Sequence, residues 1–433
     1  MTETTFTTLG LAEPLLRALT AANYTTPTPI QAQSIPALNA GRDMIGLAQT
    51  GTGKTAAFAL PMLQRLESVR QPLVRNCPRA LILAPTRELA LQIDQSVKAL
   101  GRHVRARSTV VMGGVGFGNQ AKAMAAGVDI LIATPGRLLD LIESRHVRLD
   151  RVEYFVLDEA DRMLDMGFIR DIKKIVALLP RERQSALFSA TMPEAISSLA
   201  SDLLKDPVHV SVTPAKVTVD RIEQHVYFVD AGNKRTLLTD MLAKPEMKRV
   251  IVFTRTKHGA DKVAVHLVKS GIRAEAIHGN KSQGARQRAL SQFKSGEARV
   301  LVATDIAARG IDVTEVTHVI NFELPHEPES YVHRIGRTAR AGHSGIALSF
   351  CAGDERPLLR DIERLTKTPM IVAMGERGTA GFGPRPPQQR NNGQRQGERQ
   401  GDRGQPRNNN NRSQQRRQGA GGAPRRNRDA RAA

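Results

Sequence analysis

The sequence has few of the features that mark secreted or membrane proteins. Its 433 residues include only two cysteines, Cys77 and Cys351, which lie too far apart to suggest a disulfide framework and favour a reducing compartment. No run of about eighteen apolar residues occurs, so no membrane-spanning helix is expected. Residues 1–10 lack a basic segment followed by an apolar one, so no secretory signal is visible. These absences make the cytoplasm the expected location.

Charge of one sign is abundant instead. The formal net charge is +21 and the pI is about 10.6, which indicates a polyanionic partner. The charge is uneven, because residues 381–433 contain thirteen arginines, no lysine and three acids, a net charge of +10. A chain of this length can form two or three domains, each with its own core.

Short apolar runs alternate with helical patterns in two stretches of the chain. Such alternation predicts an α/β fold, with parallel sheets covered by helices on both faces and ligands beyond the carboxyl ends of the strands. We expect one domain at residues 1–210, a linker at 211–219 and a second domain at 220–370. The runs expected as strands are 43–48, 80–84, 128–133, 154–157, 186–188, 250–253, 300–303, 319–322 and 346–350.

Two segments show neither periodicity. Residues 206–219 contain two prolines and several β-branched residues without a helical period, and we interpret them as a connector. The pattern ends again at about residue 371, and from 381 onward the chain consists mainly of Arg, Gln, Asn, Gly and Pro. Such a composition buries too little apolar surface to offset its ordering entropy, so we expect residues 371–433 to be a disordered tail.

A glycine-rich stretch follows the first apolar run and precedes a helical pattern at 55–66. Gly51 and Gly53 allow backbone N–H groups to turn toward a phosphate, Lys54 supplies a cation, and the Thr55 hydroxyl can reach Mg²⁺. The alternative is a plain glycine turn between a strand and a helix. The predicted phosphate loop comprises Ala48, Gln49, Thr50, Gly51, Thr52, Gly53, Lys54 and Thr55.

Two acids follow the run at 154–157. Asp158 can hold Mg²⁺, and Glu159 can orient or deprotonate an attacking water. Acids are also favourable at the N-terminus of any helix, so the alternative is that this pair only marks the start of a helix. Together with a phosphate loop upstream in the same domain, they predict a nucleoside triphosphatase.

Arg334, Arg337 and Arg340 are spaced by three residues in the domain that lacks a phosphate loop. Alone, this spacing is typical of a solvated helix face. An arginine directed at a transferring phosphoryl group neutralises developing charge, an effect typically worth about 10³–10⁵ in rate. We therefore expect ATP to bind between the two domains, whose closure completes the site.

With these motifs in place, residues 6–366 resemble the DEAD-box ATP-dependent RNA helicases, in particular the bacterial RhlE group. Residues 158–161, Asp-Glu-Ala-Asp, are the motif that names the family. The resemblance implies two tandem RecA-like domains that use ATP and Mg²⁺. It also implies RNA-stimulated ATP hydrolysis that separates RNA duplexes or remodels ribonucleoproteins, with ribosome-assembly or RNA-decay proteins as possible partners.

The family motifs imply roles for individual residues. Gln31, in Pro-Thr-Pro-Ile-Gln, resembles the reader of the adenine edge, and Asp305 resembles the ribose contact. The family phosphate loop itself begins with alanine, as Ala48 does here. The implied catalytic residues are Lys54, Asp158, Glu159, Arg337 and Arg340; the implied aromatic contacts to the base are Phe6 and Tyr24; and the implied coupling residues are Asp161, Ser189, Thr191 and His333.

A further set resembles the RNA-facing motifs of the family. Backbone amides, hydroxyls and arginines of this kind hold phosphates and sugars without reading bases. These residues are Pro85, Thr86, Arg87, Gly113, Gly114, Thr134, Pro135, Gly136, Arg137, Gln283, Arg286 and Thr304.

One position departs from the family pattern. Ala339 lies where the family usually has glycine, between the last two arginines of the motif. A methyl group costs something like 1 kcal/mol if that position needs a positive φ.

The motifs leave two other functions open. An ATP-gated RNA clamp that rarely unwinds duplexes would use the same residues. A DNA helicase is disfavoured mainly by the resemblance, because no residue is identified by its chemistry alone as a sensor of the 2′-hydroxyl.

The arginine-rich tail generates a prediction of its own. We expect it to tether RNA by counterion release, whereas the simpler alternative is a solubilising extension. Deleting residues 381–433 should then weaken RNA binding, and the loss should shrink as salt rises. RNA affinity measured by fluorescence anisotropy at low and high salt tests this, and equal affinity of the two proteins at low salt would contradict it.

Overall fold

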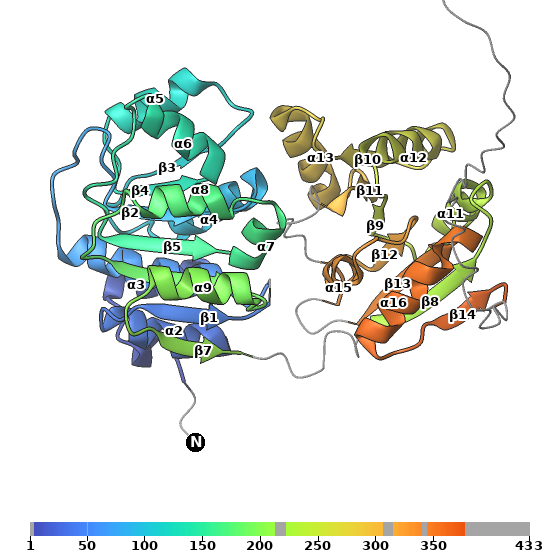
Figure 1. Cartoon of the computed structure of the whole chain (residues 1–433), viewed down its shortest axis with the longest axis horizontal. Coiled ribbons are helices and arrows are strands. Elements are labelled where there is room, and N and C mark those ends of the chain that lie inside the picture. Colours follow the sequence, from blue (N-terminus) through green and yellow to red (C-terminus); the bar gives the residue numbers. More distant parts are fainter. Residues whose placement is uncertain (1–3, 50, 213–221, 306–314, 340–343, 377–433) are drawn as a thin grey trace, which may run out of the picture. The chain divides into compact units, whose positions relative to one another are not determined.

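The computed structural model describes residues 4–49, 51–212, 222–305, 315–339 and 344–376. Thr50, Arg340, the predicted linker from residue 213 and the predicted tail from residue 377 lie outside these ranges. We call residues 4–212 the first lobe and residues 222–376 the second lobe, and each is described by itself (Figure 1).

The first lobe is a parallel sheet of seven strands in the order β3-β4-β2-β5-β6-β1-β7. Four of its central strands, β2, β4, β5 and β6, were predicted from apolar runs and are almost wholly buried. The strands are β1 (Met44–Leu47), β2 (Ala80–Leu83), β3 (Ser108–Val111), β4 (Ile130–Ala133), β5 (Tyr154–Asp158), β6 (Gln184–Ser189) and β7 (Val208–Ser211).

Helices cover both faces of this sheet. Alternate strand residues such as Ile82 and Val156 pack against α1–α4, and their neighbours Leu81 and Leu157 pack against α5–α9. Because successive side chains of a strand point to opposite faces, both kinds of neighbour must be apolar, as the runs showed. The helices are η1 (Phe6–Leu9), α1 (Glu13–Ala21), α2 (Pro29–Asn39), α3 (Lys54–Ser68), α4 (Arg87–Leu100), α5 (Phe117–Ala125), α6 (Pro135–Glu143), α7 (Ala160–Asp165), α8 (Ile169–Val176) and α9 (Glu194–Leu203).

The second lobe repeats this plan. Its seven parallel strands follow the order β10-β11-β9-β12-β13-β8-β14, which is the order of the first sheet when the strands of each lobe are counted from its start. Its elements are β8 (Ile222–Phe228), α11 (Lys234–Leu242), β9 (Val250–Phe253), α12 (Lys257–Lys269), β10 (Ala274–Ile277), α13 (Gln283–Ser295), β11 (Val300–Ala303), β12 (His318–Asn321), α15 (Pro328–Ile335), β13 (Gly345–Cys351), η2 (Gly353–Glu355), α16 (Arg356–Thr366) and β14 (Ile371–Met374).

The structure corrects two boundaries. Residues 208–211, predicted as part of a connector, form β7 and pair with β1. Residues 371–374, predicted as the start of the tail, form β14 and pair with β8. Strands β3, β8 and β10 also had no prediction. Four of these five strands lie at a sheet edge, where one side of the strand stays open and a continuous apolar run is not required.

Within the described residues, no helix is long and apolar enough to cross a membrane.

Ala339 has the backbone conformation that its position suggested. Its φ is +55°, in the left-handed region where the Cβ of an L-residue approaches a carbonyl oxygen. The residue is partly buried against the core of α15 and α16.

Ala339→Gly should therefore raise the free energy of unfolding by about 1 kcal/mol, because glycine adopts positive φ without this clash. Urea denaturation monitored by circular dichroism measures the change. Ala243→Gly is a suitable control, because Ala243 is exposed at φ −69°. That change is expected to lower stability by about 0.5 kcal/mol. A lower stability of Ala339→Gly would contradict the prediction.

Candidate active site

The predicted phosphate loop joins β1 to α3. Gly51 and Gly53 have φ of +88° and +89°, conformations that side chains other than glycine rarely adopt. A Cβ on Gly53 would also strike the Gln31 side chain. The backbone conformation thus favours glycine at position 53, and a larger residue there would also have to displace the Gln31 amide.

The loop is held closed by its own polar groups. Lys54 Nζ donates to the Ala48 carbonyl at 2.9 Å, and Thr52 Oγ1 donates to the Gln49 carbonyl at 2.7 Å. Lys54 is the first residue of α3, so its ammonium lies at the helix N-terminus. An anion bound there meets both the lysine and the positive end of the helix dipole.

Gln31 supports the loop from α2. Its Oε1 accepts from the Thr28 N–H at 2.9 Å, and its Nε2 donates to the Gly53 carbonyl at 3.1 Å. Gln31 is 1% exposed, so in this structure its amide faces the loop. The predicted contact with adenine remains a prediction. The two aromatics expected beside the base, Phe6 and Tyr24, meet edge to face with ring centroids 6.3 Å apart.

Asp158 ends β5 and is fully buried. Its Oδ1 has no hydrogen-bond partner among the described residues. Burial raises the pKa of Asp158 to about 7, while the charge of nearby Lys54 acts in the opposite direction. An unpartnered buried carboxylate oxygen is what a cation would satisfy, and together with the Thr55 hydroxyl it offers the oxygen ligands that Mg²⁺ prefers.

The described residues contain no group of three or more His, Cys, Asp or Glu able to hold a metal ion. A Mg²⁺ ion at Asp158 and Thr55 would take its other ligands from nucleotide phosphates and water, which is the usual arrangement for this ion at phosphate sites.

Glu159 is held by an ion pair that the sequence analysis did not predict. Arg162 Nη1 lies 2.5 Å from Glu159 Oε2, and both side chains are buried. Glu159 has a φ of +56° and precedes α7, so its carboxylate lies over the first helical turn. The i,i+3 spacing of the two residues could have indicated this ion pair, because residues with that spacing are neighbours on a helix surface.

The last acid of the motif, Asp161, connects the start of α7 to the end of β6 and to the segment that follows it. Asp161 Oδ2 accepts from the N–H groups of Ala190 and Thr191 at 3.1 and 3.0 Å, and from Thr191 Oγ1 at 3.1 Å. The Asp161 N–H donates to Ser189 Oγ at 3.2 Å. The structure therefore brings together the three first-lobe residues that were predicted to couple hydrolysis to strand separation.

The first-lobe residues predicted to face RNA gather at the N-termini of α4 and α6. Thr86 caps α4 by accepting from the Leu89 N–H at 3.2 Å, and Thr134 precedes α6. Arg87 lies against Gly113 and Gly114, where an added Cβ on Gly114 would strike its guanidinium. Helix N-termini of this kind bind phosphates. Pro85 lies directly before the Thr86 cap, and Pro135, Gly136 and Arg137 form the first turn of α6.

In the second lobe, Asp305 follows β11 and is bound by Arg334 of α15. Arg334 Nε lies 2.5 Å from Asp305 Oδ1, and Nη2 lies 2.7 Å from Oδ2. The guanidinium also lies over the Phe253 ring, 5.1 Å from its centroid. The sequence analysis named Arg334 among the three spaced arginines but predicted no function for it. It orients the carboxylate that was predicted to bind ribose.

The other second-lobe predictions lie on neighbouring elements. Arg337 follows α15 and its Nε donates to the His333 carbonyl at 3.2 Å. Gln283 and Arg286 occupy the first turn of α13, and Thr304 follows β11. Arg340 and Thr50 lie outside the described residues.

Comparison with known proteins identifies the family. A profile for DEAD/DEAH box helicases matches residues 28–199, and one for the helicase conserved C-terminal domain matches residues 233–342. The DEAD-box ATP-dependent RNA helicase CshA of Bacillus cereus is 44% identical over 367 residues, which cover 85% of this chain and 69% of that protein. The chain belongs to the DEAD-box ATP-dependent RNA helicases.

Other relatives agree. CshA of Bacillus subtilis is 44% identical over 366 residues, covering 84% of this chain and 73% of that protein. The structure of S. cerevisiae Dbp5 bound to RNA and ADP BeF3 aligns with a TM-score of 0.76 at 32% identity, covering 86% of this chain and 95% of that one. The chain is thus an ATP-dependent RNA helicase with two RecA-like lobes. Its assignment to the RhlE group remains a prediction.

The Arg162–Glu159 pair leads to a prediction about catalysis. Arg162→Lys keeps a charge near Glu159 but loses the fixed geometry of the guanidinium, and should lower kcat for RNA-stimulated ATP hydrolysis by about tenfold. Arg162→Met should lower it further, while KM for ATP changes little in either variant. Phosphate release at saturating RNA measures both constants.

The matched control is Arg364→Met, because Arg364 forms an exposed i,i+3 pair with Asp361 in the second lobe. It should leave kcat unchanged. A folded Arg162→Met protein with the parental kcat would contradict the prediction.

Proposed function

We propose that this helicase hydrolyses ATP at the carboxyl ends of β1 and β5, with Lys54, Asp158 and Glu159 as the reacting set. The observation that supports this most is the pairing of an unsatisfied Asp158 oxygen with a Glu159 that is already held in place by Arg162. The Asp158 carboxylate can bind a cation, whereas the Glu159 carboxylate is positioned to act on the attacking water. Two adjacent acids in such different environments are typical of divided roles.

The residues of the loop perform the binding steps. Lys54 exchanges the Ala48 carbonyl for a phosphate oxygen, and the N–H groups of the loop surround the phosphates. Mg²⁺ held by Asp158 and Thr55 would neutralise charge that develops on the phosphates. Glu159 accepts a hydrogen bond from the attacking water and orients it.

Completion of the site requires the second lobe. Arg337, with Arg340, supplies positive charge to the transferring phosphoryl group, and Asp305 contacts the ribose. Asp161, bound to Ser189 and Thr191, links the start of α7, directly after the other two acids, to the end of β6 and the segment that follows it. Because both lobes are needed, ATP and RNA binding favour one another, and each must strengthen the other by the same factor.

RNA binds through its backbone in this proposal. The helix N-termini at Thr86 and Thr134, with Arg87 and Arg137, provide phosphate donors that carry no base information. The basic tail adds an auxiliary tether of the same kind. Sequence-independent contacts suit a general cytoplasmic role such as ribosome assembly or RNA decay.

Glu159→Gln tests the assigned roles. It should lower RNA-stimulated ATP hydrolysis by about 10²–10⁴, because the amide cannot orient water as a carboxylate does. Binding of ATP and single-stranded RNA should persist, so the protein should remain on RNA while ATP is present. Phosphate release and fluorescence anisotropy of labelled RNA measure the two effects.

Lys54→Ala is the matched comparison, because it should lose ATP binding as well as turnover. Rapid hydrolysis by Glu159→Gln would refute the role given to Glu159. Competition between RNA and DNA of one sequence in the same assay tests the nucleic acid preference, and equal stimulation by DNA would contradict an RNA-specific enzyme.

A further inference from the structure

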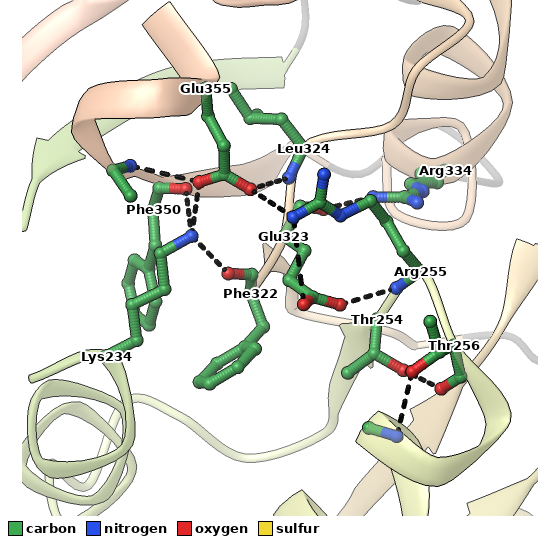
Figure 2. Close-up of polar contacts among 12 residues, drawn as sticks. Lys234, Thr254, Arg255, Thr256, Phe322, Glu323, Leu324, Arg334, Phe350 and Glu355 are labelled. Carbon is green, nitrogen blue, oxygen red and sulfur yellow. Dashed lines mark hydrogen bonds and ion pairs between the residues drawn. The ribbon is translucent and has the colours of Figure 1, made fainter. Parts of the chain in front are cut away.

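The second lobe contains a buried ion pair that no motif of the site includes. Lys234, the first residue of α11, pairs with Glu355 at the end of η2 (Figure 2). The two side chains are 4% and 2% exposed. Charged side chains are rarely buried to this extent unless they are paired. Lys234 and Glu355 are separated by 120 residues of chain, so the pair joins distant segments of the lobe.

Lys234 has no capacity for another ligand. Besides Glu355, its ammonium donates to the Phe322 carbonyl at 2.9 Å and to the Phe350 carbonyl at 3.1 Å. These three acceptors use all three protons of the ammonium. The lysine therefore links α11 both to the segment that follows β12 and to the end of β13.

Glu355 is equally engaged. Its carboxylate also accepts from the Leu324 N–H at 3.2 Å and the Ala352 N–H at 2.9 Å, and Arg255 Nη2 lies 3.4 Å from Oε1. Stability alone does not explain such an arrangement, because apolar residues of similar volume often replace a buried ion pair at little cost. A satisfied polar network does fix a unique geometry.

The network continues to Glu323. The Arg255 N–H donates to Glu323 Oε2 at 2.7 Å, so the segment after β9 is bound to the segment after β12 (Figure 2). Residues 322, 323 and 324 are thus each held by the network, through a carbonyl, a carboxylate and an N–H group.

The backbone of this segment holds Arg334. The Glu323 carbonyl accepts from Arg334 Nη1 at 2.7 Å, and Asn321 Oδ1 accepts from the same nitrogen at 3.1 Å. The other side of the guanidinium binds Asp305 with two hydrogen bonds. An unbroken series of contacts therefore runs from the Lys234–Glu355 pair to the carboxylate proposed to bind ribose.

We infer that Lys234 and Glu355 are positioning residues for ATP binding. They fix residues 322–324 so that the Glu323 carbonyl holds Arg334 in the orientation that aligns Asp305. This inference rests on the proposed role of Asp305 as the ribose contact. Neither Lys234 nor Glu355 touches the nucleotide in this assignment.

Two variants test the inference. Glu355→Gln keeps the shape of the side chain but removes its charge, and should raise KM for ATP about fivefold, as expected for one loosened hydrogen bond. The double variant Lys234→Met/Glu355→Leu replaces the ion pair with apolar groups. It should retain the fold while showing the same rise in KM, with kcat at saturating ATP changed less than twofold.

A double-mutant cycle separates positioning from general destabilisation. In an Asp305→Ala background, Glu355→Gln should have no further effect on KM, because its contribution passes through Asp305. Arg79→Gln is the matched control, since Arg79 is a buried partner of Glu153 in the first lobe. It should lower stability without changing KM for ATP.

The outcomes distinguish the two claims. An unchanged KM in Asp305→Ala alone would overturn the ribose contact on which the inference rests. A raised KM in Asp305→Ala, with the parental KM in both Glu355 variants, would overturn the positioning role. Equal effects of Glu355→Gln with and without Asp305 would also overturn it, because the two residues would then act independently.

Discussion

Burial of charge at the carboxyl ends of parallel strands governs both lobes of this helicase. Every strand of a parallel sheet ends at the same edge, so polar residues that follow different strands are brought together while the strands themselves remain apolar. Taking a charge out of water costs several kcal/mol unless partners replace the lost solvation. The pairs Glu159–Arg162, Arg334–Asp305 and Lys234–Glu355 all meet this requirement with close partners.

The two lobes differ in how completely their buried charged groups are paired. In the first lobe, one oxygen of Asp158 has no hydrogen-bond partner among the residues that the structure describes, and Lys54 donates to the Ala48 carbonyl of its own loop. Those groups have capacity for a ligand. In the second lobe, the ammonium of Lys234 and both oxygens of Glu355 have protein partners. The first arrangement is suited to binding, and the second to holding a fixed geometry.

Much of this could be predicted from the sequence, for reasons visible in particular residues. Strands buried on both faces, such as β2 and β4, must be continuously apolar. The residues of the phosphate loop, like the two acids at the end of β5, lie next to one another in the sequence. Edge strands such as β7 and β14 need no such run and were missed. The ion pair of Arg162 with Glu159 could have been predicted from their i,i+3 spacing. The Lys234–Glu355 pair could not be predicted in this way, because a contact between segments so far apart in the chain depends on the arrangement of the whole sheet.

The shared strand order gives each lobe a lysine at the same place in its topology. In each lobe, the first strand leads through a short loop to a helix whose first residue is lysine: β1 leads to Lys54, and β8 leads to Lys234. The loop before Lys234 has Asn233 at φ −92° where the other has Gly53 at +89°, so it does not adopt the anion-binding turn. Glu355 instead supplies the carboxylate that Lys234 meets, and the Phe322 and Phe350 carbonyls accept its other protons. The second lobe thus repeats the strand order of the first, with a lysine at the corresponding helix start that is neutralised from within the fold.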